Sequence, residues 1–289
     1  MIGNSAYAGV QQLATPRNVA EAIARLLRES GFDQVDLQLD VDNAAFRSAV
    51  RKFNQTSAGA GIAVIFYAGH GLEIHGVNYL VPVDAKLAGD VDAPNEAVPL
   101  ERLVSAADGA RKLRIVLLDV CRDNPYARKM RRVSRAEVGP ALPGIGKVEP
   151  TRSDTLIAYA ARAGSTSEEG DGDHSPYTAA LLRSIAVPGL DIRLAMGRVR
   201  AEVMKLTAGR QEPFVDGSMA AGAFPLVPAS APPLSGDSDQ AIDDSNLVKR
   251  LGTRKAFEVF LSTYGPGLYA DLARAELDKL ETGQPAGRQ

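Results

Sequence analysis

Cysteine is nearly absent from this chain of 289 residues, which contains one cysteine, three histidines and no tryptophan. A single cysteine cannot form an internal disulfide, which excludes a small secreted scaffold held together by disulfides. So few cysteines and histidines also argue against a zinc module built on cysteine clusters. The lone cysteine, Cys121, is therefore either a small core residue or a reactive thiol, and composition alone favours the core residue.

An excess of charge of one sign is also lacking. The 33 Lys and Arg residues are balanced by 35 Asp and Glu residues, for a net charge of -2. This balance provides no basic surface for nucleic acid, and no apolar run is long enough for a transmembrane helix. We therefore expect neither a nucleic acid nor a membrane as a partner, and no cofactor.

Little strand-forming sequence precedes the first turn. A single apolar residue, Ile2, stands before a Gly-Asn-Ser turn, so the first strand is predicted to be almost missing and to leave one place in the sheet open. As written, the sequence has no signal peptide and predicts a cytoplasmic protein. A signal peptide ahead of Met1 would instead make the protein periplasmic or secreted.

Helical and strand-like segments alternate along the first part of the chain. Residues 35–39 alternate apolar and polar side chains, which is typical of a half-buried strand. Residues 62–67, 113–118 and 155–159 are continuous apolar runs, which indicate strands covered on both faces. With amphipathic helices between and after them, these strands predict an α/β fold, a three-layer sandwich whose central, mostly parallel sheet is flanked by helices.

The composition divides the chain into three parts. Residues 1–227 carry the predicted sheet, and residues 228–246 are poor in apolar side chains and are predicted to be a linker. Residues 247–283 contain two short amphipathic segments and are predicted to form a helical hairpin. Because such a hairpin is too small to be stable alone, we expect it to dock on something, such as a protein partner.

Two chemically active residues follow neighbouring buried strands. His70 lies in Ala-Gly-His-Gly after the first apolar run, and Cys121 lies in Asp-Val-Cys-Arg after the second. Parallel sheets place their sites at the carboxyl ends of the strands. A nearby histidine can take the proton of a thiol, whose pKa is otherwise about 8.5, and can later protonate a leaving amine. The pair therefore indicates nucleophilic catalysis.

The motifs VIFYAGHG and IVLLDVCRDNP resemble those of the caspase-like superfamily, specifically its bacterial caspase-like and metacaspase branch. The start of the chain, VNYLVPVDA and SPYTAALLRSI are similar to that branch too, and the resemblance covers roughly residues 1–226. It implies a caspase-hemoglobinase fold and a caspase-like peptidase domain over residues 1–227. It also implies His70 as the base, Cys121 as the nucleophile, and the Gly71 and Cys121 amides as the oxyanion hole.

Specificity follows from Asp119, two residues before Cys121 and hence on the same side of the strand. A carboxylate at the floor of the substrate pocket would pair with Arg or Lys, so we expect a peptide or protein substrate cut after a basic residue. The family usually carries a second acidic residue where this chain has Val19; Asp173 is a weak candidate to supply that charge. The alternative role for Asp119 is to cap a loop.

Two rival readings remain. One is a catalytically inactive caspase-like scaffold or interaction module, which the short first strand and Val19 favour. The other is cleavage after aspartate, for which Arg17 is the obvious basic candidate and which Asp119 opposes.

The sequence also contains two long polar segments that are predicted to be loops. The basic run 128–135 within residues 122–152 suggests self-processing, and the acidic run 168–173 suggests calcium binding, although a plain acidic turn is favoured there because the EF-hand spacing is absent. The remaining histidines, His75 at a predicted hairpin tip and His174, are expected to be exposed and are not spaced for a metal site.

Overall fold

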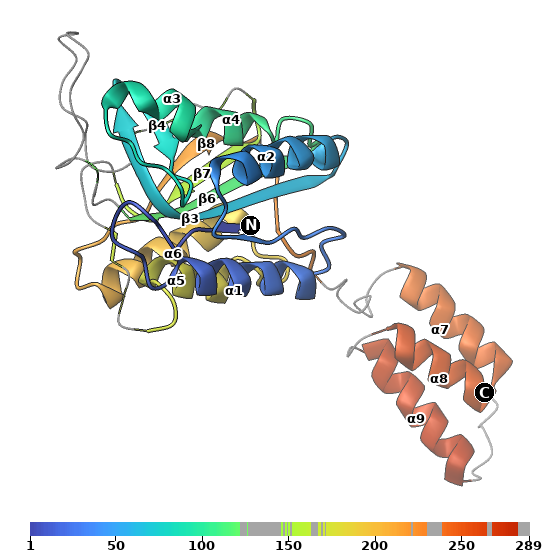
Figure 1. Ribbon diagram of the computed structural model, residues 1–289. Helices are drawn as coiled ribbons and strands as arrows, with labels where there is room; N and C mark the ends of the chain where they lie inside the picture. The colour runs from blue at the N-terminus through green and yellow to red at the C-terminus, as the bar shows by residue number, and fades with distance from the viewer. Residues whose placement is uncertain are drawn as a thin grey trace. The chain divides into compact units, whose positions relative to one another are not determined.

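A computed structural model describes residues 1–121, 126, 146, 148, 150, 152–162, 167–168, 170, 172–220, 222–229, 239–264 and 268–282. These residues divide into two compact units, Met1–Val227 and Pro228–Gln289 (Figure 1). No helix in this described part of the chain is long and apolar enough to cross a membrane.

The described residues of the first unit form one sheet with eight strands. The strands are β1 (Ile2–Gly3), β2 (Gln38–Leu39), β3 (Ile62–Ile74), β4 (Val77–Leu80), β5 (Val98–Pro99), β6 (Leu113–Cys121), β7 (Thr155–Tyr159) and β8 (Phe214–Ser218). The main path runs in the order β2-β1-β3-β6-β7-β8, and β4 pairs with β3 and β5. The first four pairings along this path are parallel, and β8 is antiparallel to β7.

Helices cover both faces of this sheet (Figure 1). The first unit contains α1 (Pro16–Glu29), α2 (Asn43–Ser57), α3 (Ala93–Glu96), α4 (Leu100–Ser105), α5 (Pro176–Ser184) and α6 (Ile192–Leu206), with the 3-10 turn η1 (Asp90–Asp92) before α3. One apolar core joins α1, α5 and α6 to the sheet, and a second joins α2 and α4 to its other face. The predicted α/β sandwich with a mostly parallel sheet is therefore confirmed.

The period-2 pleat decides which core each strand residue enters. Val64 and Phe66 of β3 pack toward α1, α5 and α6, whereas Ala63, Ile65 and Tyr67 pack toward α2 and α4. Because successive side chains alternate between faces, a strand that is buried on both faces must be apolar throughout. That requirement is the reason the three continuous apolar runs correctly predicted β3, β6 and β7.

The first strand is present but has only two residues, both of which are paired on either side. Ile2 and Gly3 lie between β2 and β3, in register with Gln38 and Leu39 on one side and with Tyr67 and Ala68 on the other. The strand predicted over residues 35–39 is correspondingly shortened to Gln38–Leu39. Because β1 pairs only with Gln38 and Leu39, residues 35–37 have no strand residues of β1 opposite them.

The second unit differs from the predicted linker and two-helix hairpin. Its described residues form three helices, α7 (Asp239–Leu251), α8 (Arg254–Thr263) and α9 (Leu268–Thr282), so residues 239–246 are helical. Val248 of α7 packs with Phe257, Phe260 and Tyr264, and Tyr264 donates a hydrogen bond to Asp244 (2.5 Å). Residues 239–246 were misread as a linker because they contain few apolar side chains.

Candidate active site

His70 and Cys121 are direct neighbours across two strands of the sheet. β3 and β6 run parallel from Ile62↔Leu113 to His70↔Cys121, so the two residues are register partners at the last step of the ladder. Adjacent strands lie about 4.8 Å apart, which sets the scale of the separation between their backbones. The sequence prediction that the two residues leave equivalent ends of neighbouring strands agrees with this register.

A pair of tyrosines holds the backbone at His70. The His70 N–H donates to Tyr7 Oη (2.8 Å), and Tyr67 Oη donates to the His70 carbonyl (2.8 Å). Gly69, at φ 152°, leaves room for both hydroxyls, because a Cβ there would lie 2.6 Å from Tyr7 Oη and 2.8 Å from Tyr67 Oη. The glycine before His70 is therefore required by this close approach.

The His70 imidazole is buried and oriented from two directions. Its ring packs against the Tyr7 ring with centroids 4.4 Å apart, and the residue is 3 % exposed. Its Nε2 lies 3.1 Å from the carbonyl oxygen of Gln11. A carbonyl can only accept a hydrogen bond, so Nε2 carries the proton and Nδ1 is the basic nitrogen of the neutral ring.

The main chain of Gly71 faces away from β4. Val81 N–H donates to the His70 carbonyl (3.1 Å), which makes Gly71 and Leu80 a non-hydrogen-bonded pair of this antiparallel ladder. The Gly71 N–H is therefore directed to the opposite edge of β3, the side on which β6 and Cys121 lie. This is the orientation that an oxyanion-hole donor next to Cys121 would need.

Asp119 lies in the described part of β6 and is 7 % exposed. Its Oδ2 accepts hydrogen bonds from the hydroxyls of Ser175 (2.5 Å) and Thr178 (2.7 Å), which belong to the N-cap and first turn of α5. Burial, and then the nearby Asp119 charge, raise the pKa of the Tyr177 hydroxyl well above its usual value. The carboxylate thus ties β6 to α5, a structural role beyond the one predicted from the sequence.

The other residues considered for substrate binding are dispersed. Asp173 is exposed and lies two residues before Ser175, so the chain keeps it within about 7 Å of the α5 cap. Val19 is 1 % exposed and belongs to the apolar core. Arg17 was the basic candidate for binding a substrate aspartate. Its guanidinium forms an ion pair with Asp40 (2.5 Å).

The expectation that the two other histidines are exposed is partly wrong. His75 forms the two-residue tip of the β3–β4 hairpin with Gly76, at φ 52° and 79°, which is typical of a type I′ turn. His75 is exposed but its Nε2 lies 3.1 Å from Asp90 Oδ2. His174 is partly buried, because it immediately precedes the α5 cap.

Most of residues 122–152, and part of residues 161–176, fall outside the described residues. The basic run 128–135 lies there entirely, as do Glu169 and Asp171 of the acidic run. Glu168 is described and pairs with Arg210 (2.7 Å), and the hydrogen bond from Arg210 lowers the pKa of this carboxyl. Among the described residues, no group of three or more His, Cys, Asp or Glu side chains is arranged to hold a metal.

The model of the caspase domain family, Peptidase C14, matches residues 1–225 of this sequence. The chain belongs to the caspase domain family. The predicted resemblance to the caspase-like superfamily is thereby confirmed, and with it the assignment to a family of cysteine peptidases; the bacterial caspase-like and metacaspase branch stays a prediction. The match ends two residues before the boundary of the first compact unit, so the caspase domain and that unit coincide.

A human protein, mucosa-associated lymphoid tissue lymphoma translocation protein 1, is similar to part of the chain. The two are 31% identical over 122 residues, which is 42% of this chain and 14% of the human protein. The chain therefore spans about a seventh of the length of this relative.

Sequence reasoning did not assign roles in the site to Tyr7, Gln11, Ser175 and Thr178. Tyr7 and His70 are 63 residues apart, and Ser175 and Asp119 are 56 apart, so no local pattern connects them. The one available signal was Ser175-Pro176, an N-cap residue followed by proline at the first helical position. It marks the start of α5 but not the strand on which that start is anchored.

Proposed function

We propose that this caspase domain is a cysteine endopeptidase that uses His70 and Cys121 and cuts after Arg or Lys. The observation that carries the proposal is the register pairing of these two residues at the carboxyl end of the sheet. A base on one strand and a nucleophile on its neighbour are the minimum that thiol catalysis requires. The Gln11 carbonyl supports the base by leaving Nδ1 as the nitrogen that accepts a proton.

The reaction proceeds through a thioester. His70 takes the thiol proton of Cys121, and the sulfur forms a bond to the carbonyl carbon of the substrate. The N–H groups of Gly71 and Cys121 stabilise the resulting oxyanion. When the C–N bond breaks, His70 gives its proton to the leaving amine, and water then hydrolyses the thioester with His70 again as the base.

Asp119 sets the preference for a basic residue in this proposal. Its carboxylate is buried at the same end of β6, and its Oδ2 accepts hydrogen bonds from two hydroxyls. An ionised carboxylate in a buried position favours a cationic partner, and the planar guanidinium of Arg can pair with it through two hydrogen bonds. Asp173 adds negative charge near the cap of α5.

Fluorogenic peptides that end in Arg, Lys or Asp test this function with the wild-type chain and the Cys121→Ala variant. We expect hydrolysis after Arg and Lys by the wild type and none by the variant. Cleavage after Asp alone would overturn the role of Asp119. Hydrolysis of none of the peptides, with and without calcium, would favour the inactive scaffold instead.

Self-processing within residues 122–152 is part of the proposal, because a basic loop directly after the nucleophile matches the proposed specificity. Incubating the wild type beside Cys121→Ala and mapping the fragments by mass spectrometry tests it. A cut in residues 128–135 that appears in the wild type alone is the expected result. If the segment stays intact while peptide substrates are hydrolysed, self-processing is wrong and the peptidase assignment stands.

A further inference from the structure

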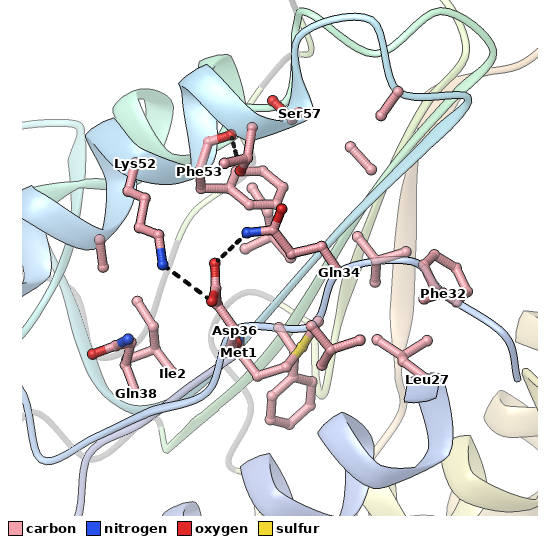
Figure 2. Close-up of a pocket in the computed structure, with 18 of the residues that line it drawn as sticks. Met1, Ile2, Leu27, Phe32, Gln34, Asp36, Gln38, Lys52, Phe53 and Ser57 are labelled. Atoms are coloured by element: carbon pink, nitrogen blue, oxygen red, sulfur yellow. Dashed lines mark hydrogen bonds and ion pairs between the residues drawn. The ribbon is translucent and has the colours of Figure 1, made fainter. Parts of the chain in front are cut away.

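The amino end of the sheet has two features with buried or partly buried charge. One is a cavity of about 290 Å³ beside the beginning of β3, where Asp36 accepts hydrogen bonds from Lys52 (3.2 Å) and Gln34 (3.0 Å) (Figure 2). The carboxylate at the cavity therefore has its counter-charge within the protein. The other is Arg114, which lies near the start of β6 and is 4 % exposed.

Arg114 is a buried cation whose partners are main-chain carbonyls. Its Nη1 donates to the Ser153 carbonyl (2.8 Å), and its Nη2 donates to the Ala110 carbonyl. Its Nε is also buried and has no hydrogen-bond acceptor among the described residues. In the part of the chain that the structure describes, no carboxylate forms an ion pair with this guanidinium. Because a buried charge without a counter-charge is costly, such a position favours an anion.

Thr155 of β7 places a second unsatisfied group beside this cation. It is the register partner of Arg114 and is 1 % exposed, and its Oγ1 has no hydrogen-bond partner within the described structure. Val116 and Ile157, two residues further along the same strands, both enter the core on the side of α2 and α4. Alternate residues of a strand share a face, and adjacent strands lie about 4.8 Å apart. The hydroxyl and the guanidinium therefore project to the same side from neighbouring positions.

The two unsatisfied groups can both donate a hydrogen bond. A guanidinium N–H can only donate, and a threonine hydroxyl can donate as well as accept. The two carbonyls near the guanidinium already accept bonds from it. A water molecule would accept both bonds but would need acceptors for its own hydrogens, and the next residues of both strands on this face are apolar. A guest that only accepts, which is an anion, therefore matches these groups better.

The surrounding charges and the burial narrow the choice of anion. Arg111 and Lys112, directly before β6, are exposed cations. Two carboxylates on or beside β7 and β8, those of Asp154 and Asp216, accept hydrogen bonds from main-chain N–H groups (2.8 and 3.0 Å). Because both donor residues are almost completely buried, their position suits a single-atom ion and not a phosphate or a carboxylate, whose several oxygens need more donors.

We propose that Arg114 and Thr155 bind one chloride ion between β6 and β7, on the face of the sheet that α2 and α4 cover. The ion accepts hydrogen bonds from Arg114 Nε and from the Thr155 hydroxyl, and it supplies the counter-charge for the guanidinium. Arg114 is seven residues before Cys121, which corresponds to about 23 Å along the strand. The proposal is therefore independent of the peptidase activity.

A chloride titration of the full chain at constant ionic strength tests this site. Sodium chloride replaces sodium gluconate, whose anion is too large for a buried position, and the melting temperature is recorded. We expect a saturable rise of about 2–4 °C when chloride reaches about five times its dissociation constant. Arg114→Met and Thr155→Val should lose most of this rise, whereas the exposed control Arg111→Met should keep it.

Thr155→Val gives a second readout that does not depend on whether Arg114→Met folds. Valine has nearly the shape of threonine, so in gluconate the substitution removes only a buried hydroxyl that has no partner. We therefore expect this variant to melt at or above the wild-type temperature in gluconate and below it in chloride. The same difference from the wild type in both salts would contradict the proposal.

Crystals grown in sodium bromide locate the ion directly, because bromide can replace chloride and scatters X-rays anomalously. We expect an anomalous peak within hydrogen-bonding distance of Arg114 Nε and Thr155 Oγ1. A water molecule at this place, or no peak there, would overturn the proposal. An equal rise of the melting temperature with chloride in the wild type and in all three variants would overturn it too, because it would show a general salt effect.

Discussion

The two ends of β3 lie in the same sheet but differ in how completely they are paired. At its carboxyl end, β3 is flanked by β6 and β4, and Tyr7 and Tyr67 satisfy the main chain of His70. At its amino end, β3 pairs with β6 on one side and borders an apolar cavity on the other. The proposed catalytic pair therefore lies at the end of β3 where the main chain is densely hydrogen-bonded, and the amino end is only partly paired.

The largest expected effect distinguishes His70, which lies in β3, from His75, which lies in the turn after β3. Replacing His70 by Ala removes the proposed general base, so we expect kcat/KM to fall by about 10²–10⁴-fold. Replacing His75 by Ala, at the exposed hairpin tip of β3, should change kcat/KM by less than about twofold. Steady-state hydrolysis of an Arg peptide measures both, with melting temperatures to verify folding. A similar loss for the two variants would contradict the placement of the chemistry at His70.

The strands at the site show what the sequence could and could not predict. The apolar runs predicted β3 and β6 but placed their ends near Tyr67 and Leu118, whereas the strands continue to Ile74 and Cys121. Hydropathy cannot follow a strand through polar residues such as Asp119. The strand continues there because hydroxyls 56 and 59 residues away satisfy the carboxylate.

Residue types, in contrast, were sufficient to single out the candidate site. The glycines beside His70 and the lone Cys121 after an apolar run identified both strand ends without knowledge of the fold. The amino end of β3 gave no such signal, because a run of apolar residues does not show whether another strand pairs with it. The cavity could therefore be recognised only from the register of β1.

Replacing Asp119 is expected to cause the second-largest loss of kcat/KM. Asp119→Asn keeps an oxygen that can accept from Ser175 or Thr178 but removes the negative charge. We therefore expect kcat/KM for Arg and Lys peptides to fall by about 10²-fold, since the loss of a charged hydrogen-bonding partner costs about 3 kcal/mol. Asp173→Asn is the exposed control and should have a much smaller effect. Unchanged selectivity in Asp119→Asn would show that this carboxylate serves only to anchor α5.

Removing the hydroxyl of the tyrosine beside His70 should lower kcat by a smaller factor. Tyr7→Phe keeps the ring against the imidazole but removes the oxygen that accepts from the His70 N–H. We expect kcat to fall about tenfold with KM unchanged, because a misplaced base weakens the chemical step and not substrate binding. Tyr126→Phe is the matched control, since Tyr126 belongs to the same apolar cluster and its hydroxyl faces the Ala85 carbonyl. An increase in KM with unchanged kcat would exclude a positioning role for Tyr7.

The smallest effect concerns a carboxylate that caps a helix away from His70. Asp191 accepts hydrogen bonds from Arg193 Nε (2.8 Å) and from the N–H groups of Arg193 and Phe224 (both 2.9 Å), and these bonds, that from the Arg193 side chain foremost, hold its pKa well below the usual range. Asp191→Asn should lower the free energy of unfolding at pH 7 by about 1 kcal/mol and leave kcat/KM unchanged.

The sign of the pH dependence follows from the direction of this pKa shift. Below about pH 4 the unfolded chain binds a proton at Asp191 while the folded chain does not, so the stabilisation is present above that pH and is lost as the pH falls toward the folded pKa. Denaturant unfolding at pH 7 and pH 3 should therefore show a smaller difference between wild type and Asp191→Asn at pH 3. The exposed Asp33→Asn variant is measured in parallel as the control. A difference that stays constant with pH would mean that Asp191 stabilises α6 by its shape and not by its charge.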